Sequence, residues 1–270
     1  MSCSRLPADE RHLKFEKSVI FGVVVCASAD SSGTNCPNMK GMVIIMRMRR
    51  KKHLDERLAD CAGVNLGWLI DYAAEQRGEV QQRTLDVQEI FGNENPVHLE
   101  VGCGKGGFIV QAAQQNPDIN FIAVEMARNV IVSAMELAMK MDLPNLKFLM
   151  GKAEYLEKFF PESSVERIYL NFSCPYPKET YKKHRLTHSG FLEIYKKILV
   201  PNGEIHQKTD NMKLFEFSIE SFSSCGFTLK NVSLDLHNSG FEGNIITEYE
   251  KRFSDAGFPI YRLEAVNSSK

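Results

Sequence analysis

A glycine-rich turn able to hold a nucleotide lies between residues 99 and 108, LEVGCGKGGF. The apolar residues of 97–101 alternate as in a β-strand, and the turn follows that strand directly. The glycines of the turn are Gly102, Gly104, Gly106 and Gly107. Without a Cβ atom, each lets the backbone approach a ligand closely. The segment therefore predicts a nucleotide-binding turn between a strand and a helix.

Two acidic residues narrow the kind of nucleotide. Glu125 ends the next predicted strand, where a carboxylate can accept hydrogen bonds from both ribose hydroxyls. That position suits an NAD-dependent oxidoreductase, whose G-x-G-x-x-G fingerprint the turn also satisfies. Glu100 precedes the turn and makes E-x-G-x-G-x-G, which resembles the first motif of class I methyltransferases. In that class the acid braces the turn near the methionine end of S-adenosylmethionine, so we favour a sulfonium cofactor.

The elements that must position these residues alternate regularly along the chain. Strands are predicted at 97–101, 121–125, 147–150, 167–172 and 203–209, and helices at 105–115, 127–141, 153–159, 189–199 and 213–225. Such alternation predicts a doubly wound α/β fold with a mostly parallel sheet and helices on both faces. Ligands of such folds bind at the carboxyl ends of the strands.

Composition limits the partners. The 33 basic and 34 acidic residues nearly cancel, so a nucleic acid must be held by a local patch. The seven cysteines include no C-x-x-C pair, which argues against a disulfide framework and a thiolate zinc site and favours a reducing compartment. His184 and His188 lack a second ligand pair, so no metal is predicted.

The first 45 residues differ from the rest. The apolar run 18–29 has the outline of a signal peptide but is too short for a membrane span. The competing interpretation, which we favour, is that translation begins at Met42, Met46 or Met48. We therefore expect residues 1–45 to be a poorly ordered extension or a mis-assigned start, and residues 46–270 to form the functional domain.

The segment before the glycine turn carries a basic run at 47–57, which is either a solvated terminus or a phosphate-binding arm. Apolar spacing predicts helices at 68–73 and 85–90. Residues 92–96 contain the break before the first strand.

Three later segments make a resemblance specific. They are NFSCPYPKETYKKHRL at 171–186, HQKTDNMKLFEFS at 206–218 and LDLHNSGFEGNIITEYEKRFSDAGFPIYRLEA at 234–265. In this order they resemble the bacterial tRNA (guanine-N7)-methyltransferase family, from about residue 46 to 265. The resemblance implies a seven-stranded class I methyltransferase fold, S-adenosylmethionine as cofactor and tRNA as partner. It further implies methyl transfer to guanine N7 at position 46 of the variable loop, in the cytoplasm, by a monomer or homodimer without a membrane anchor or metal.

The resemblance also assigns site residues. For the cofactor they are Glu100, Gly102, Gly104, Gly106, Glu125, Lys152 and Cys174. For the tRNA guanosine they are Lys178, Asp210, Thr247 and Glu250. Cys174 and Asp210 occupy the catalytic positions. Asp210 is expected to read the guanine donors and stabilise the cationic product, or alternatively to cap the helix that follows.

The chain departs from the family at two site positions. Cys174 stands where the family has aspartate, and Lys152 replaces an acid, with Glu154 as a partial substitute. A thiol is mostly neutral at pH 7 unless a positive neighbour lowers its pKa.

The basic run after the fourth strand is also altered. Glu179 and Thr180 stand at basic positions, Tyr181 at a histidine position, His184 at an arginine position and Tyr176 at the tryptophan position. The basic residues that remain are Lys178, Lys182, Lys183 and Arg185. Fewer phosphate contacts predict weaker and less salt-sensitive RNA binding.

These departures leave alternatives open. The chain is an active guanine-N7 methyltransferase, which we favour, or a tRNA-binding homologue with weak or no methyl transfer. It is otherwise a methyltransferase for another RNA base, since NFSCPYP resembles the Asn-Pro-Pro-Tyr segment of amino-group methyltransferases and Cys174 suggests thiol attack.

Overall fold

The computed structural model describes residues 50–71 and 79–268. The expected extension at 1–45 lies outside this range. No helix in these two ranges is long and apolar enough to cross a membrane.

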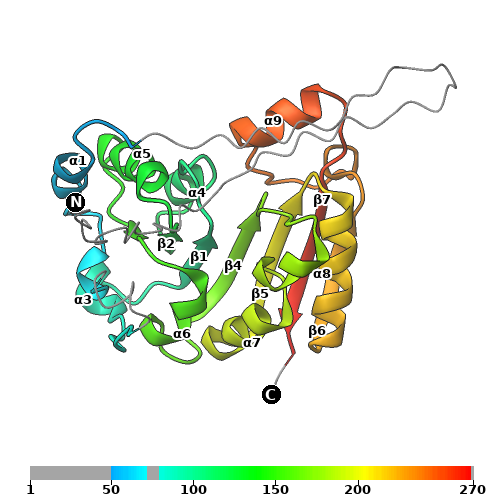
Figure 1. The fold of residues 1–270 in the computed structure, drawn as a ribbon, viewed down its shortest axis with the longest axis horizontal. Coiled ribbons are helices and arrows are strands. Elements are labelled where there is room, and N and C mark those ends of the chain that lie inside the picture. The colour runs from blue at the N-terminus through cyan, green and yellow to red at the C-terminus, as the bar shows by residue number, and fades with distance from the viewer. Residues whose placement is uncertain (1–49, 72–78, 269–270) are drawn as a thin grey trace, which may run out of the picture. The chain divides into compact units, whose positions relative to one another are not determined.

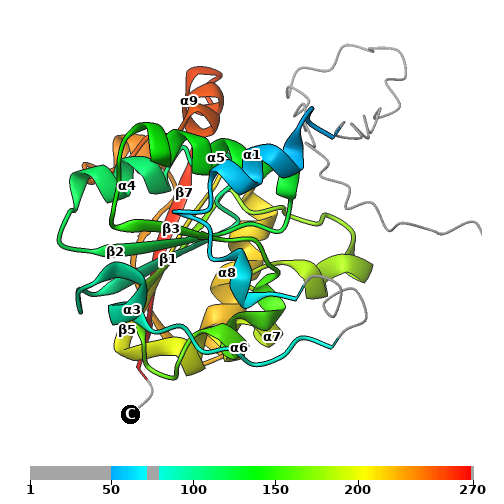
Figure 2. The same ribbon diagram turned by 90° about the vertical axis from the view of Figure 1, so that its left-hand side faces the viewer.

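Seven strands form one sheet. They are β1 (Val97–Val101), β2 (Asn120–Val124), β3 (Leu146–Leu149), β4 (Val165–Asn171), β5 (Leu199–Thr209), β6 (Phe227–Ser233) and β7 (Tyr261–Asn267). Their order is β3-β2-β1-β4-β5-β7-β6; Figure 1 labels every strand except β3, which Figure 2 labels. β7 alone runs in the opposite direction to the other six strands, so it is antiparallel to both β5 and β6. The predicted mostly parallel, doubly wound sheet is confirmed.

The helices fill the connections. The α-helices are α1 (Leu54–Asp60), α3 (Val87–Phe91), α4 (Ile109–Gln115), α5 (Arg128–Lys140), α6 (Leu156–Phe159), α7 (Ser189–Ile198), α8 (Met212–Ser224) and α9 (Glu248–Asp255). The 3-10 helices are η1 (Gly67–Leu69), η2 (Ala153–Tyr155), η3 (Glu179–His184) and η4 (Leu236–Asn238). The helix predicted at 68–73 is wrong in its described part, because Ile70 is already extended and ends the single turn η1.

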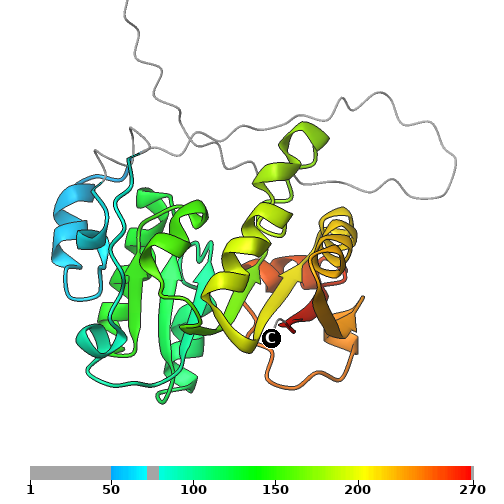
Figure 3. The same cartoon turned by 90° about the horizontal axis from the view of Figure 1, so that it is seen from below.

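Side chains that alternate along the strands build two apolar cores. Leu99, Ile122 and Ile168 belong to the core that α6, α7 and α8 complete. Phe121 and Ala123 belong to the other, with α1, α4 and α5. Because successive strand residues point to opposite faces, helices cover both sides of the sheet. Figure 2 shows α1, α4 and α5 grouped together, and Figure 3 separates this half from the orange and red C-terminal strands.

The parallel register brings separate parts of the chain to one edge. Val101 pairs with Val124, Val124 with Leu149, and Asn171 with Lys208. The carboxyl ends of β1 to β5 therefore meet at the edge above which Figure 1 shows α9. This edge positions the predicted site.

Candidate methyltransferase site

The glycine turn moves the start of α4, the helix that follows β1, to a later residue than predicted. Gly102, Gly104 and Gly106 have φ of 83°, 57° and 83°, the left-handed region that other residues rarely adopt. Residues 102–108 therefore stay outside α4, which begins four residues later than the predicted helix. A Cβ at Gly104 would meet no protein atom within 4 Å, whereas one at Gly106 would lie 2.9 Å from the Cβ of Ala134. Gly104 thus faces open space, and Gly106 makes room for α5.

Glu100 lies beneath this turn with only 2% of its surface exposed. Its Oε1 accepts a hydrogen bond of 2.9 Å from Nδ2 of Asn171, at the end of β4. Its Oε2 is buried, and no group among residues 50–71 and 79–268 meets the geometry of a full hydrogen bond to it. The backbone amide of Ile109, at the start of α4, lies near enough to the carboxyl to oppose the effect of burial on its pKa. Burial raises the pKa of Glu100 to about 7. An orphaned carboxylate oxygen beneath an open glycine turn fits the ammonium group of an amino-acid-like ligand.

Glu125 follows β2 and is braced by two backbone amides. Gly104 N donates to Oε2 at 3.3 Å, and Ala127 N donates to Oε1 at 2.8 Å. Burial raises the pKa of Glu125, and these amides oppose the rise. Each carboxylate oxygen has a second lone pair for a ribose hydroxyl. The geometry therefore suits the predicted ribose contact.

Lys152 follows β3 at the same edge. Its Nζ lies 5.6 Å from the ring centroid of Tyr155, so the amine packs over an aromatic face. The neighbouring Glu154 is exposed, and its charge acts on the hydroxyl of Tyr176. Position 152 therefore carries an amine over an aromatic ring in place of the acid that the resemblance implies.

The segment after β4 is held in an unusual backbone conformation. Phe172 and Tyr176 have φ of 50° and 40°, where bulky side chains are rare. Arg185 is buried and donates to Pro175 O and Tyr176 O, both at 3.1 Å. Its guanidinium carbon lies 4.5 Å from the ring centroid of Phe217. Arg185 therefore holds this loop and is not the phosphate contact that its place in the basic run suggests.

Cys174 lies half-buried in this loop. Burial raises the pKa of its thiol above the ordinary 9.0, so the group is neutral at pH 7. The Tyr249 hydroxyl is influenced by the charges of both Asp210 and Cys174, and burial raises its pKa to about 12. Tyr249 on α9 is thus a third polar group beside the two predicted catalytic positions.

Asp210 follows β5 and is half-buried, which raises the pKa of its carboxyl. The expectation that it caps the next helix is wrong: the cap is Asn211, whose Oδ1 accepts from Leu214 N at 2.9 Å. The backbone therefore leaves Asp210 available for a ligand at the sheet edge.

The two predicted guanosine contacts at α9, Thr247 and Glu250, are both buried. Thr247 caps α9 by accepting from Glu250 N at 3.1 Å, and its Cβ lies 3.7 Å from the position of a Cβ on Gly107. Glu250 is fully buried, with Lys208 Nζ at 2.7 Å from Oε2 and Asn244 Nδ2 at 2.6 Å from Oε1. Glu250 thus anchors the 244–250 segment over the turn. Lys178, in contrast, is exposed at the start of η3.

Two arginines in the described part of the basic run at 47–57 pair with acidic side chains of the fold. Arg57 makes two hydrogen bonds of 2.6 Å to Glu136 on α5, and Arg50 pairs with Asp55. The described part of this run therefore docks α1, which weakens the interpretation as a phosphate-binding arm.

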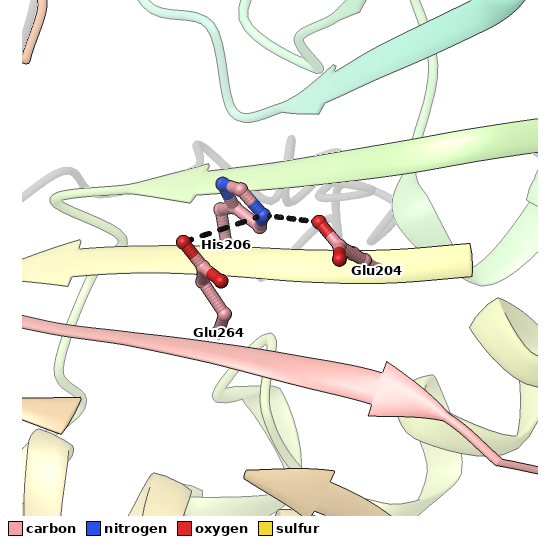
Figure 4. Close-up of side chains that lie close together, drawn as sticks. All are labelled: Glu204, His206 and Glu264. Atoms are coloured by element: carbon pink, nitrogen blue, oxygen red, sulfur yellow. Dashed lines mark hydrogen bonds and ion pairs between the residues drawn. The ribbon is translucent and has the colours of Figure 1, made fainter. Parts of the chain in front are cut away.

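A second polar cluster lies away from the site, where Glu204, His206 and Glu264 meet on β5 and β7 (Figure 4). His206 Nε2 is 2.7 Å from Glu204 and 3.9 Å from Glu264. Lys230 pairs with both carboxylates, and Arg167 and Arg262 pair with Glu204 and Glu264 respectively, so basic side chains already balance the two negative charges. The cluster serves to join β5, β6 and β7.

The structural roles of four residues of the site were not predicted, although Arg185 was counted in the basic run and Tyr249 lies within the 247–250 segment assigned to the guanosine. The four are Asn171, Arg185, Lys208 and Tyr249. Each lies inside a segment that carried the resemblance, which was the available signal. Their roles depend on burial and pairing across the sheet, which spacing along the chain does not encode.

The sheet order, the glycine turn and the acids at the first two strand ends define a class I methyltransferase fold. A family model described as a methyltransferase matches residues 94–263. The solved 16S rRNA methyltransferase KamB has the same fold, with a TM-score of 0.50, 19% identity, and coverage of 68% of this chain and 94% of that chain.

Curated relatives narrow the class. The tRNA (guanine-N(7)-)-methyltransferase of Geobacillus sp. (strain WCH70) is 48% identical over 219 residues, covering 81% of this chain and 94% of the relative. That of Listeria monocytogenes serotype 4a (strain HCC23) is 54% identical over 178 residues, covering 66% and 83%. That of Bacillus cytotoxicus is 45% identical over 220 residues, covering 82% and 96%. The chain belongs to the tRNA (guanine-N(7)-)-methyltransferase family.

Proposed function

We propose that this chain transfers a methyl group from S-adenosylmethionine to guanine N7 of tRNA, at position 46 as the resemblance implies. The observation that carries the proposal is Glu100, a buried carboxylate with one orphaned oxygen beneath the open glycine turn. S-adenosylmethionine supplies an electrophilic methyl on a sulfonium, together with an ammonium group for Glu100 and a ribose for Glu125. Gly102 and Gly104 keep the turn open beside them.

The reaction asks little of acid–base chemistry. Guanine N7 already has an in-plane lone pair, so the protein need only align it with the methyl carbon and the leaving sulfur. Asp210 stabilises the positive charge that develops on the base and accepts hydrogen bonds from the guanine N1 and exocyclic amino groups. The proposal assigns Thr247 and Lys178 to the tRNA: Thr247 lies next to Gly107 of the glycine turn, and Lys178 is exposed at the start of η3.

Cys174 changes the electrostatics of this site. A neutral thiol gives no fixed charge near the methyl group, so transition-state stabilisation rests on Asp210, with Tyr249 beside it. The raised pKa also argues against thiol attack on a pyrimidine, which needs a thiolate. A tRNA substrate implies a cytoplasmic enzyme.

A methylation assay tests the proposal. Purified protein with unmodified tRNA and S-adenosylmethionine should yield 7-methylguanosine in the nuclease digest, and an Asp210→Asn variant should lose about 10²-fold in rate, as removal of a transition-state stabiliser does. Cys174→Asp should raise the rate by restoring a carboxylate. Absence of 7-methylguanosine with wild type, together with its appearance in Cys174→Asp, would identify the native chain as a tRNA-binding homologue. Another methylated base would overturn the N7 assignment.

A further inference from the structure

A row of three aromatic side chains leads outward from the site. The ring centroids of Tyr176 and His184 are 5.6 Å apart, and those of His184 and Tyr181 are 6.2 Å apart. The row begins inside the site, because the charges of Glu125 and Glu154 act on the Tyr176 hydroxyl. It ends in solvent at Tyr181, whose side chain is 50% exposed.

Tyr181 and His184, the two outer residues of the row, do not pack into the core of the protein. Tyr181 and His184 belong to η3, a 3-10 helix without a buried residue. The loop itself is held from below by Arg185, through Pro175 O and Tyr176 O. The fold therefore does not need aromatic rings at positions 181 and 184 to keep this loop in place.

The surroundings of the row carry positive charge. Lys178, Lys182 and Lys183 lie on or beside the same turn and are exposed. Of these, Lys182 has a distant partner in Glu179 at 3.8 Å. Exposed rings between lysines are the usual arrangement for an unstacked nucleotide, in which a base stacks on a ring while the backbone phosphate meets a cation.

We propose that Tyr181 and His184 form a stacking platform for an unpaired tRNA base next to the target guanosine. This inference rests on the proposed function, because a base must leave its helical stack for its neighbour to reach the buried carboxylates of the site. The platform holds the flanking base outside while Tyr176 borders the site within. Stacking is tolerant of base identity, so the platform favours an open loop over a particular sequence.

The platform predicts a specific coupling between protein and RNA. Tyr181→Ala should raise the Kd for tRNA about tenfold, whereas Tyr181→Phe, which keeps the ring, should bind within about twofold of wild type. Abasic replacement of the stacked nucleotide should weaken wild type about tenfold but should not weaken Tyr181→Ala further. The salt dependence of binding should be unchanged in Tyr181→Ala, because no phosphate contact is lost.

The experiment measures tRNA binding by fluorescence anisotropy, with transcripts that are abasic at each position on either side of the target guanosine. Equal Kd values for wild type and Tyr181→Ala would overturn the platform. It would also be overturned if, at every abasic position, the loss of affinity from the missing base and the loss from Tyr181→Ala were additive. Far-ultraviolet circular dichroism checks the fold of each variant. Because binding is read without turnover, this result is independent of whether wild type forms 7-methylguanosine, so failure of the platform and failure of the proposed activity are distinguishable.

Discussion

At the scale of single residues, Glu100 combines two features that ordinary folding would avoid. It is a buried carboxyl with one oxygen unpaired within residues 50–71 and 79–268, and burial raises its pKa to about 7 from an ordinary value of 4.5. In the folded protein the group therefore binds a proton over a pH range where the unfolded chain has released it. Burying an incompletely hydrogen-bonded carboxyl destabilises the folded protein. Groups of this kind are typical of functional sites, where a bound ligand offsets the loss of stability.

Glu100→Gln tests this directly. A raised folded-state pKa adds stability below about pH 4.5 that is lost as the pH rises through about 7, so the free energy of unfolding of wild type should fall by up to about 3 kcal/mol across that interval through this group. The variant cannot titrate there, so its decline should be smaller by about that amount. Urea unfolding at pH 5 and pH 8 measures the difference. Parallel pH profiles for the two proteins would show that Glu100 keeps an ordinary pKa.

At the scale of elements, two adjacent residues after β5 have different roles: one caps the next helix, and the other lies at the edge of the sheet where the ligand is proposed to bind. Asn211 caps α8 through Leu214 N, while Asp210 is half-buried at the sheet edge. The side chain of a helix cap satisfies an amide that the helix itself leaves unpaired.

Separate substitutions of Asn211 and Asp210 should affect different properties: the first the free energy of unfolding, and the second the methylation rate. Asn211→Ala should lower the free energy of unfolding by about 1 kcal/mol, because the Leu214 amide loses its acceptor. Asp210→Asn should leave thermal stability close to wild type and lower the methylation rate. Differential scanning calorimetry and the methylation assay measure the two effects. A larger loss of stability in Asp210→Asn than in Asn211→Ala would return the capping role to Asp210.

The type and order of most of these elements can be predicted from the sequence, but some of their boundaries cannot. The strands from β1 to β5 and the helices between them were predictable, because parallel strands are buried apolar runs that alternate with amphipathic helices. Boundaries failed where local geometry decides them: the left-handed glycines shorten α4, and β5 begins at Leu199, directly after α7. Arg185 was misread because a basic run predicts exposure, whereas its guanidinium is buried against the loop.

At the scale of the whole molecule, charge decides how tRNA is held. The net charge is −1, so the chain as a whole does not attract a polyanion. Within the described part of the first basic run, Arg57 pairs with Glu136 on α5 and so docks α1. Under the proposed function, we expect the exposed lysines of η3 to supply the local electrostatic contact with tRNA.

Salt dependence measures that contact. Replacing Lys182 and Lys183 with glutamine should lower the slope of log Kd against log salt by about 1.5, since each phosphate contact contributes about 0.7 to 0.9. Lys140→Gln is the matched control: Lys140 ends α5, a helix that starts at the carboxyl edge and runs away from it. Its slope should equal that of wild type. If the slope is unchanged in the double variant, the phosphate contacts lie elsewhere on the molecule. η3 would then contact tRNA only through its aromatic side chains.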